Sequence, residues 1–144
     1  MTTTSHKAYT AAIATALSTQ LNSLGNSANS AASSNIDNTT NLDLFHDLTL
    51  TVATQGSARS AGATVGVYLI MALDGTNLDA VNETTAELVA TFQLDAATTS
   101  RQLTRRDVPI PPGVFAYFLR NATGQAFASS GNLLEYRGHS LQSV

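Results

Sequence analysis

The sequence contains no cysteine and no tryptophan, and charged residues make up only 12% of its 144 residues, about half the usual share in a globular protein. Without cysteine the chain can form no disulfide framework, no thiolate metal site and no cysteine nucleophile. The formal net charge is -3, so the chain lacks the basic excess that binding to duplex nucleic acid requires. We therefore expect no nucleic-acid partner.

Long apolar runs are also missing. No segment approaches the roughly 18 consecutive apolar residues of a membrane span, so we expect no membrane partner. The first residues, Met-Thr-Thr-Thr-Ser-His-Lys, lead into an alanine and threonine stretch without the apolar core of a signal peptide. We expect a soluble protein made in a cytoplasm. The length suits a single domain and is sufficient to bury a hydrophobic core.

The few charges are unevenly distributed along the chain. Residues 1–36 contain one charged side chain, Lys7, whereas the other six basic and all ten acidic residues lie from Asp37 onward. The first quarter of the chain therefore differs in chemistry from the rest.

Apolar residues in this first quarter recur at helical spacing. Tyr9, Ile13, Leu17, Leu21 and Leu24 follow one another at intervals of four, four, four and three, among alanines of high helix propensity. The spacing predicts an amphipathic helix over residues 8–24; the alternative is a low-complexity Thr/Ala arm. Residues 26–41 are almost purely small and polar, which indicates an extended linker. We assign residues 1–41 to an N-terminal helix and polar arm.

Beyond residue 41 the apolar period changes from helical to two. Apolar side chains alternate with polar ones, Asp74-Gly75 marks a turn, and Pro109-Ile-Pro-Pro-Gly113 predicts a rigid connection outside the ladder. Short strands without helical crossovers are typical of an antiparallel sandwich, and no internal repeat is visible. We expect a mainly β protein, with a jelly-roll-like β-sandwich over residues 42–144 and strands over 42–52, 63–73, 88–94, 101–108, 114–120 and 132–136.

The strands over 63–73 and 114–120 are apolar on both faces. One face of each is expected to pack on the other sheet. The second face is covered either by another chain or by the N-terminal helix.

The three histidines, His6, His46 and His139, are scattered and lack zinc-binding spacing. His46 is in phase with the apolar side of its strand, which favours a buried, hydrogen-bonded histidine over a ligand or a base. No nucleophile elbow, phosphate-binding loop, dinucleotide fingerprint or metalloprotease motif occurs. We therefore expect no enzyme activity, no catalytic residue, no metal site and no cofactor.

Two further segments have more than one interpretation. The loop Asp74–Asp79 offers closely spaced oxygen ligands for Ca²⁺, but it lacks the other carboxylates of an EF-hand, which favours a plain Asp-Gly turn. Arg101, Arg105 and Arg106 form the basic concentration of the chain. They are either the charged side chains of a solvated edge strand or a docking patch for an acidic partner.

Several segments from residue 16 onward resemble a known family, the capsid cement or decoration proteins of tailed bacteriophages, which have a jelly-roll sandwich. The resemblance lies in pattern and order and includes no catalytic motif. The segments that carry it are Ala16–Leu24, Ile36–Leu44, Val67–Asn77, Val108–Gly113, Phe118–Asn121 and Ser130–Leu133.

The resemblance implies a virion structural protein, made in the bacterial host cytoplasm, that binds the outer surface of an icosahedral capsid. There it would bridge neighbouring subunits of the major capsid protein and pair with its own copy, for which we favour a homodimer because two-fold contacts are the commonest closed symmetry. In this role the arm would tie the protein to the capsid. The expected contact residues are Tyr9, Ile13, Leu17, Leu21, Leu24 and Ile36.

Two alternative functions remain open at this point. A carbohydrate-binding β-sandwich is the first, although such sites present exposed aromatic platforms and this chain has only five phenylalanines and four tyrosines, most of them in phase with core positions. A head-tail or neck adaptor of the virion is the second.

Overall fold

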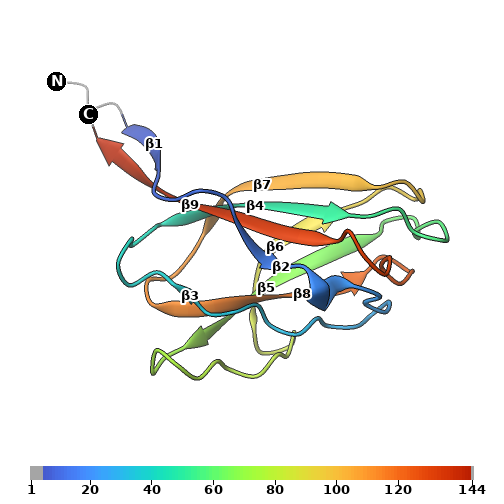
Figure 1. Ribbon diagram of the computed structural model, residues 1–144, viewed down its shortest axis with the longest axis horizontal. Coiled ribbons are helices and arrows are strands. Elements are labelled where there is room, and N and C mark those ends of the chain that lie inside the picture. The colour runs from blue at the N-terminus through green and yellow to red at the C-terminus, as the bar shows by residue number, and fades with distance from the viewer. Residues whose placement is uncertain (1–4, 144) are drawn as a thin grey trace.

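The computed structural model describes residues 5–143, which form two antiparallel β-sheets packed face to face (Figure 1). Sheet A has the strand order β1-β9-β4-β7, with β2 also paired to β9, and sheet B has the order β3-β8-β5-β6. This confirms the mainly β sandwich. The strands are β1 (Ser5–Tyr9), β2 (Ala14–Leu17), β3 (Ile36–Asp37), β4 (Phe45–Val52), β5 (Thr64–Ala72), β6 (Glu87–Gln93), β7 (Arg101–Pro109), β8 (Val114–Ala122) and β9 (Leu133–Ser143).

The alternating segments form strands close to where the sequence predicted them. β4, however, begins at Phe45 and not at residue 42, and Pro109, expected outside the ladder, is the last residue of β7. In β4 every second residue is buried, from His46 to Val52, because this strand has one face on the core. The last strand is longer than expected, since β9 continues to Ser143. Within residues 5–143 no helix has the length and apolar character needed to span a membrane.

The predicted helix over residues 8–24 is wrong. Residues 5–9 and 14–17 pair with β9 instead, and only a single 3-10 turn, Thr19–Leu21, follows them. The leucine spacing that resembled a helical stripe arises because β2 ends on Leu17 and the turn then directs Leu21 and Leu24 into the same core. Pairing with a neighbouring strand supplies the backbone hydrogen bonds that a helix would have made internally, so tertiary structure overrides local propensity.

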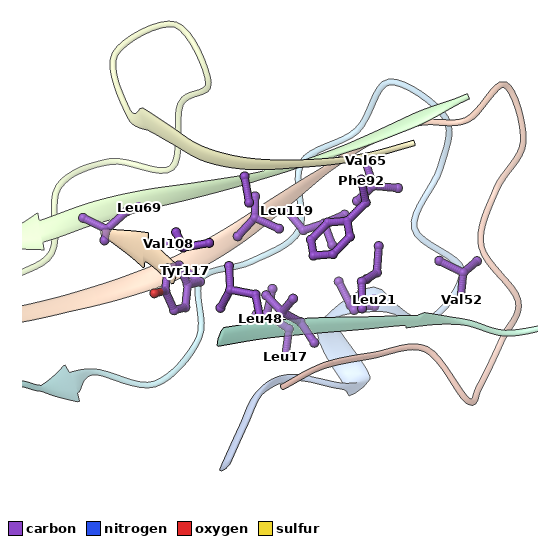
Figure 2. Packing of buried hydrophobic residues seen from close by; sticks show 14 of the residues in the cluster. Leu17, Leu21, Leu48, Val52, Val65, Leu69, Phe92, Val108, Tyr117 and Leu119 are labelled. Carbon is purple, nitrogen blue, oxygen red and sulfur yellow. The ribbon is translucent and has the colours of Figure 1, made fainter. Parts of the chain in front are cut away.

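The core lies between the two sheets (Figure 2). Leu17 and Leu21 enter it from the N-terminal segment and are fully buried beside Leu48 of β4, while Phe92 and Leu119 enter it from sheet B. The N-terminal segment is therefore part of the sandwich.

The polar segment over residues 26–35, here called the strap, runs along the edge of β8. The backbone N–H groups of Ser30 and Ser33 donate to the carbonyls of Leu119 and Tyr117, both at 2.8 Å. In return, the hydroxyl oxygens of Ser30 and Ser33 accept from the backbone N–H groups of Leu119, at 3.0 Å, and Tyr117, at 3.1 Å. Serine hydroxyls thus replace the backbone carbonyls of a regular strand.

The outer face of sheet B is covered by the chain itself. Phe118 is fully buried on this face and stacks on Tyr68 with ring centroids 5.1 Å apart. Leu78 and Ala86, from the β5–β6 loop, and Ala32 of the strap pack against the same cluster. The second apolar face of β5 and β8 is therefore buried by this loop and the strap, and the expected helix has no part in it.

Candidate interaction surface

β1 and the C-terminal half of β9 extend beyond the sandwich as a two-stranded ribbon (Figure 1). Their register pairs Ser5 with Ser143 and Tyr9 with His139. The two ends of the described chain lie together at this ribbon.

Exposed apolar residues occur on the chain segments that meet where the ribbon leaves the sandwich. Leu42, Leu44 and Leu141 each expose more than half of their surface, and Tyr9 is 43% exposed. Two hydrogen bonds join these segments: the N–H of Leu44 donates to the His139 carbonyl at 3.2 Å, and the Ser140 hydroxyl donates to the Leu42 carbonyl at 3.4 Å. These four residues, Tyr9, Leu42, Leu44 and Leu141, are here called the apolar tip.

Tyr9 is held in place on the outer face of sheet A. Its hydroxyl donates to Oδ2 of Asp47 at 2.9 Å, and the guanidinium carbon of Arg137 lies 3.9 Å from the ring centroid. Arg137 is itself fixed, because its Nε donates to the Ala11 carbonyl at 2.9 Å. The exposed ring is therefore pre-organised, which lowers the entropy lost when a partner binds it.

A groove of about 230 Å³ continues from Tyr9 across the outer face of sheet A. Most of the side chains that line it can donate or accept hydrogen bonds, and those of Thr49, Gln102, Thr104 and Glu135 come from the outward-facing positions of adjacent strands. Besides Tyr9 and Ile13, the lining residues are Asp47, Thr49, Gln102, Thr104, Arg106, Glu135, Tyr136 and Arg137.

The six predicted arm contacts divide into two groups. Tyr9 and Ile13 are exposed, at 43% and 64%, and both line the groove. The other four are buried in the sandwich core, where they stabilise the fold and offer little or no surface to a partner. These four are Leu17, Leu21, Leu24 and Ile36.

The three arginines of β7 do not point in one direction. Arg101 pairs with the carboxylate of Asp95, and the Nε of Arg105 donates to the Thr91 carbonyl of β6 at 2.8 Å. Arg106 lines the groove. Hydrogen bonds from Arg101, and then from the buried Arg59, hold the pKa of the Asp95 carboxyl below its usual range. Two of the three arginines therefore brace the edges of the two sheets.

His46 is buried and hydrogen-bonded, as its phase in the strand predicted. Its Nδ1 lies 2.8 Å from the Tyr117 hydroxyl, and its ring stacks on Tyr136 at 4.6 Å between centroids. Burial is the largest cause that lowers the pKa of His46 to about 4, and His139 lowers it further. Burial also raises the pKa of the Tyr117 hydroxyl. At neutral pH this cluster is uncharged.

Two groups of side chains carry atoms that could act as metal ligands. In the Asp74–Asp79 loop, Asp74 accepts the backbone N–H groups of Thr76 and Asn77 at 2.8 and 2.7 Å, which lowers the pKa of its carboxyl, so the carboxylate serves the turn. Asp47, Asp107 and His139 come together on the outer face of sheet A, with ligand atoms within 4.8 Å of one another. Sequence spacing gave no sign of this second group, because the three residues lie far apart along the chain.

The fold places the protein in the class of antiparallel β-sandwiches. No protein-family model and no curated protein matches the chain. Among solved structures, it is similar to a glycoside hydrolase family 43 arabinoxylan arabinofuranohydrolase from Bacillus subtilis, solved in complex with cellotetraose, at 18% identity and a TM-score of 0.39. The similarity covers 85% of this chain and 20% of that one, so the chain spans about a fifth of the hydrolase.

Proposed function

We propose that this protein is a virion structural protein that binds the outer surface of a tailed-phage capsid and cements neighbouring subunits of the major capsid protein. The observation that carries the proposal is the apolar tip, where Leu42, Leu44 and Leu141 are exposed beside Tyr9. Exposed apolar groups gathered at one end of a domain are a common mark of a protein interaction site. The resemblance to capsid cement proteins supplies the partner.

The strand order supports a jelly roll as the form of the sandwich. The antiparallel pairs β2:β9, β3:β8, β4:β7 and β5:β6 are nested within one another, as in a long hairpin rolled into two sheets. Jelly rolls occur in viral capsid and lectin domains, so this topology is compatible with the proposed function and with its alternative.

The apolar tip alone offers a small contact area, so stable binding requires several contacts with the capsid at once. On a repeating capsid surface, a second copy of the chain supplies these contacts, because linked weak sites gain from effective concentration. We therefore include a homodimer on the capsid in the proposal. None of the four side chains of the tip is charged, so this surface loses little hydration energy when a partner covers it.

Capsids purified from a phage that lacks this chain provide the test. Labelled protein is mixed with the capsids, which are then sedimented, and bound copies per capsid are counted. We expect saturable binding, reduced at least tenfold in Leu44→Asp and Leu141→Asp. Leu73→Asp, at a leucine that is 90% exposed and lies outside the tip, should bind like the wild type. Wild-type protein that does not sediment with the capsids, or tip variants that bind as well as it does, would refute the proposal.

A carbohydrate-binding module is the alternative that one observation favours. The groove on sheet A combines the exposed Tyr9 ring with hydrogen-bonding side chains such as Gln102 and Glu135, a combination that suits sugar recognition. Saturable binding to a glycan array, lost in Thr104→Ala and Arg106→Ala but kept in Leu73→Asp, would support it. An electron cryomicroscopy map of the virion would separate a capsid protein from a neck adaptor by its position.

A further inference from the structure

Three side chains from adjacent strands of sheet A meet on its outer face: Asp47 of β4, Asp107 of β7 and His139 of β9. The His139 side chain has no exposed surface. Its ring lies between Phe45, stacked at 5.5 Å between centroids, and Tyr9, edge-on at 5.6 Å. The imidazole is therefore held in one orientation by packing on both sides.

A bulge in β7 aims Asp107 at this ring. The register between β4 and β7 shifts at Asp47, and Asp107 has a φ of 56°, in the left-handed region. Bulges re-aim a side chain in this way. As a result, Oδ1 of Asp107 lies 2.8 Å from Nε2 of His139, while the Asp107 backbone N–H donates to Oδ1 of Asp47 at 3.0 Å.

The other ring nitrogen of His139 has no hydrogen-bond partner among the described residues. Nδ1 is buried and lies 3.9 Å from Oδ1 of Asp47, which is too far for a hydrogen bond. When Nε2–H donates to Asp107, Nδ1 carries a lone pair, and a carboxylate oxygen of Asp47 lies 3.9 Å from this nitrogen. A buried acceptor without a partner destabilises the folded state, and two acceptors close to each other repel. A cation between them would give Nδ1 a partner and remove the repulsion.

We propose that Asp47 and His139 bind a divalent transition-metal ion, with Zn²⁺ as the reference ion, and that Asp107 orients the imidazole. Zinc binds imidazole nitrogen and carboxylate oxygen at about 2.0–2.2 Å, so two ligands of one ion lie about 3.3 Å apart. The 3.9 Å between Nδ1 and Oδ1 closes to this value with a small movement of Asp47. A carboxylate on the second ring nitrogen is the usual outer partner of a metal-bound histidine.

The ligand types favour zinc over calcium or magnesium. An imidazole nitrogen suits borderline ions, whereas Ca²⁺ and Mg²⁺ take oxygen ligands almost throughout. With two protein ligands, water completes the coordination. An ion here would join β4 and β9 directly, and β7 through Asp107, at the base of the ribbon that carries the apolar tip.

Calorimetric titration of the full chain with ZnCl₂ tests the site, and MgCl₂ is the comparison ion. We expect one zinc ion per chain, a higher melting temperature in zinc and no change in magnesium. Asp47→Asn keeps the size of the side chain and an acceptor for the Asp107 N–H, while its NH₂ group replaces the oxygen that faces the Tyr9 hydroxyl, which can accept from it. This variant should weaken zinc binding at least tenfold. Asp79→Asn, an exposed acidic residue outside the cluster, should bind zinc like the wild type.

The imidazole ¹⁵N resonances locate the ion within the protein. Zinc is expected to shift Nδ1 of His139 and to leave the ring of His46 bonded to Tyr117. The proposal is overturned if zinc shifts only the resonances of His6, if Asp47→Asn binds zinc as tightly as the wild type, or if no binding is measured.

Discussion

His46 is the residue whose burial has the clearest consequence for stability. The lowered pKa of about 4 reflects first the loss of hydration in the core and then the neighbouring His139, while Asp47 acts in the opposite sense. An unfolded chain has no such environment, so its His46 titrates near 6.5. The unfolded state therefore takes up a proton at a higher pH than the folded state.

We predict that the free energy of unfolding falls as the pH drops from about 6.5 to about 4 and that His46 has no effect above this window. The full loss is roughly 3 kcal/mol, from a pKa difference of somewhat more than two units. Urea unfolding at about pH 7 and about pH 4.5, in a buffer with a metal chelator, measures it. The His46→Gln variant should lose less free energy of unfolding than the wild type between these two pH values. An equal loss in both proteins would mean that other groups cause the acid sensitivity.

Gly138 is a residue at which even a methyl group is excluded. It lies in β9 opposite His46, and a Cβ atom there would overlap the buried carboxylate of Asp43. Asp43 cannot move away easily, because its Oδ1 accepts from the Thr10 hydroxyl at 2.7 Å and its backbone N–H donates to Asn38.

Gly138→Ala should therefore lower the free energy of unfolding by about 1–3 kcal/mol, the usual range for overpacking. Gly56→Ala is the matched control, since no atom lies within 4 Å of its added Cβ. Thermal and urea unfolding of both variants give the comparison. Equal stability of the two would mean that Asp43 relaxes without loss.

Among the elements, the strap shows how a polar sequence can follow a sheet edge. Ser27, Ser30 and Ser33 recur every third residue, and their backbone N–H groups donate to β8 carbonyls at every second residue. Three residues of the strap therefore cover the same length as two residues of β8. The short Asn-Ser-Ala repeat at residues 26–31 matches this geometry, although we expected no internal repeat from the sequence.

Ser30→Ala and Ser33→Ala test the strap, because each leaves a buried N–H of β8 without its acceptor. We expect a loss of about 1–3 kcal/mol of stability for each variant and faster amide exchange at Leu119 and Tyr117, respectively. The exposed Ser34 provides the control variant Ser34→Ala, with little change in either measurement. Slow exchange at Leu119 in Ser30→Ala would show that another group takes the place of the hydroxyl.

The strands of the sandwich could be predicted from the sequence where one periodicity dominates. Leu48, Leu50 and Val52 alternate with threonines and an aspartate, and only an extended strand buries such a set on one face. The helix prediction failed because apolar residues four apart also fit a short strand followed by a 3-10 turn. Whether this segment becomes a helix or a strand depends on its pairing with β9, which lies more than a hundred residues away in the sequence.

The candidate sites were less predictable for the same reason. Asp47, Asp107 and His139 meet only through the pairing of three strands and one bulge. The spacing of residues along the sequence predicts neither the pairing nor the bulge. The apolar tip likewise combines Tyr9 with Leu42, Leu44 and Leu141 from separate segments. In contrast, the burial of His46 follows from its phase within one strand, and the sequence was sufficient to predict it.

At the scale of the whole molecule, the first 41 residues and the rest are interdependent. β1 and β2 pair with β9, and β3 and the strap line β8. The N-terminal segment also fills part of the core, with Leu17, Leu21, Leu24 and Ile36. Removal of this segment would expose the edges of both sheets and leave the core underfilled.

We therefore predict that residues 42–144 alone do not fold into the sandwich. Truncation of a buried leucine or isoleucine to alanine costs about 2–5 kcal/mol, so the loss of these three leucines and one isoleucine is comparable to the whole stability of a domain, about 5–15 kcal/mol. Circular dichroism and urea unfolding of this fragment should show no cooperative transition, and residues 1–41 added as a separate peptide should restore one. A cooperative transition of the fragment alone would instead establish residues 42–144 as an independent domain and residues 1–41 as a detachable arm.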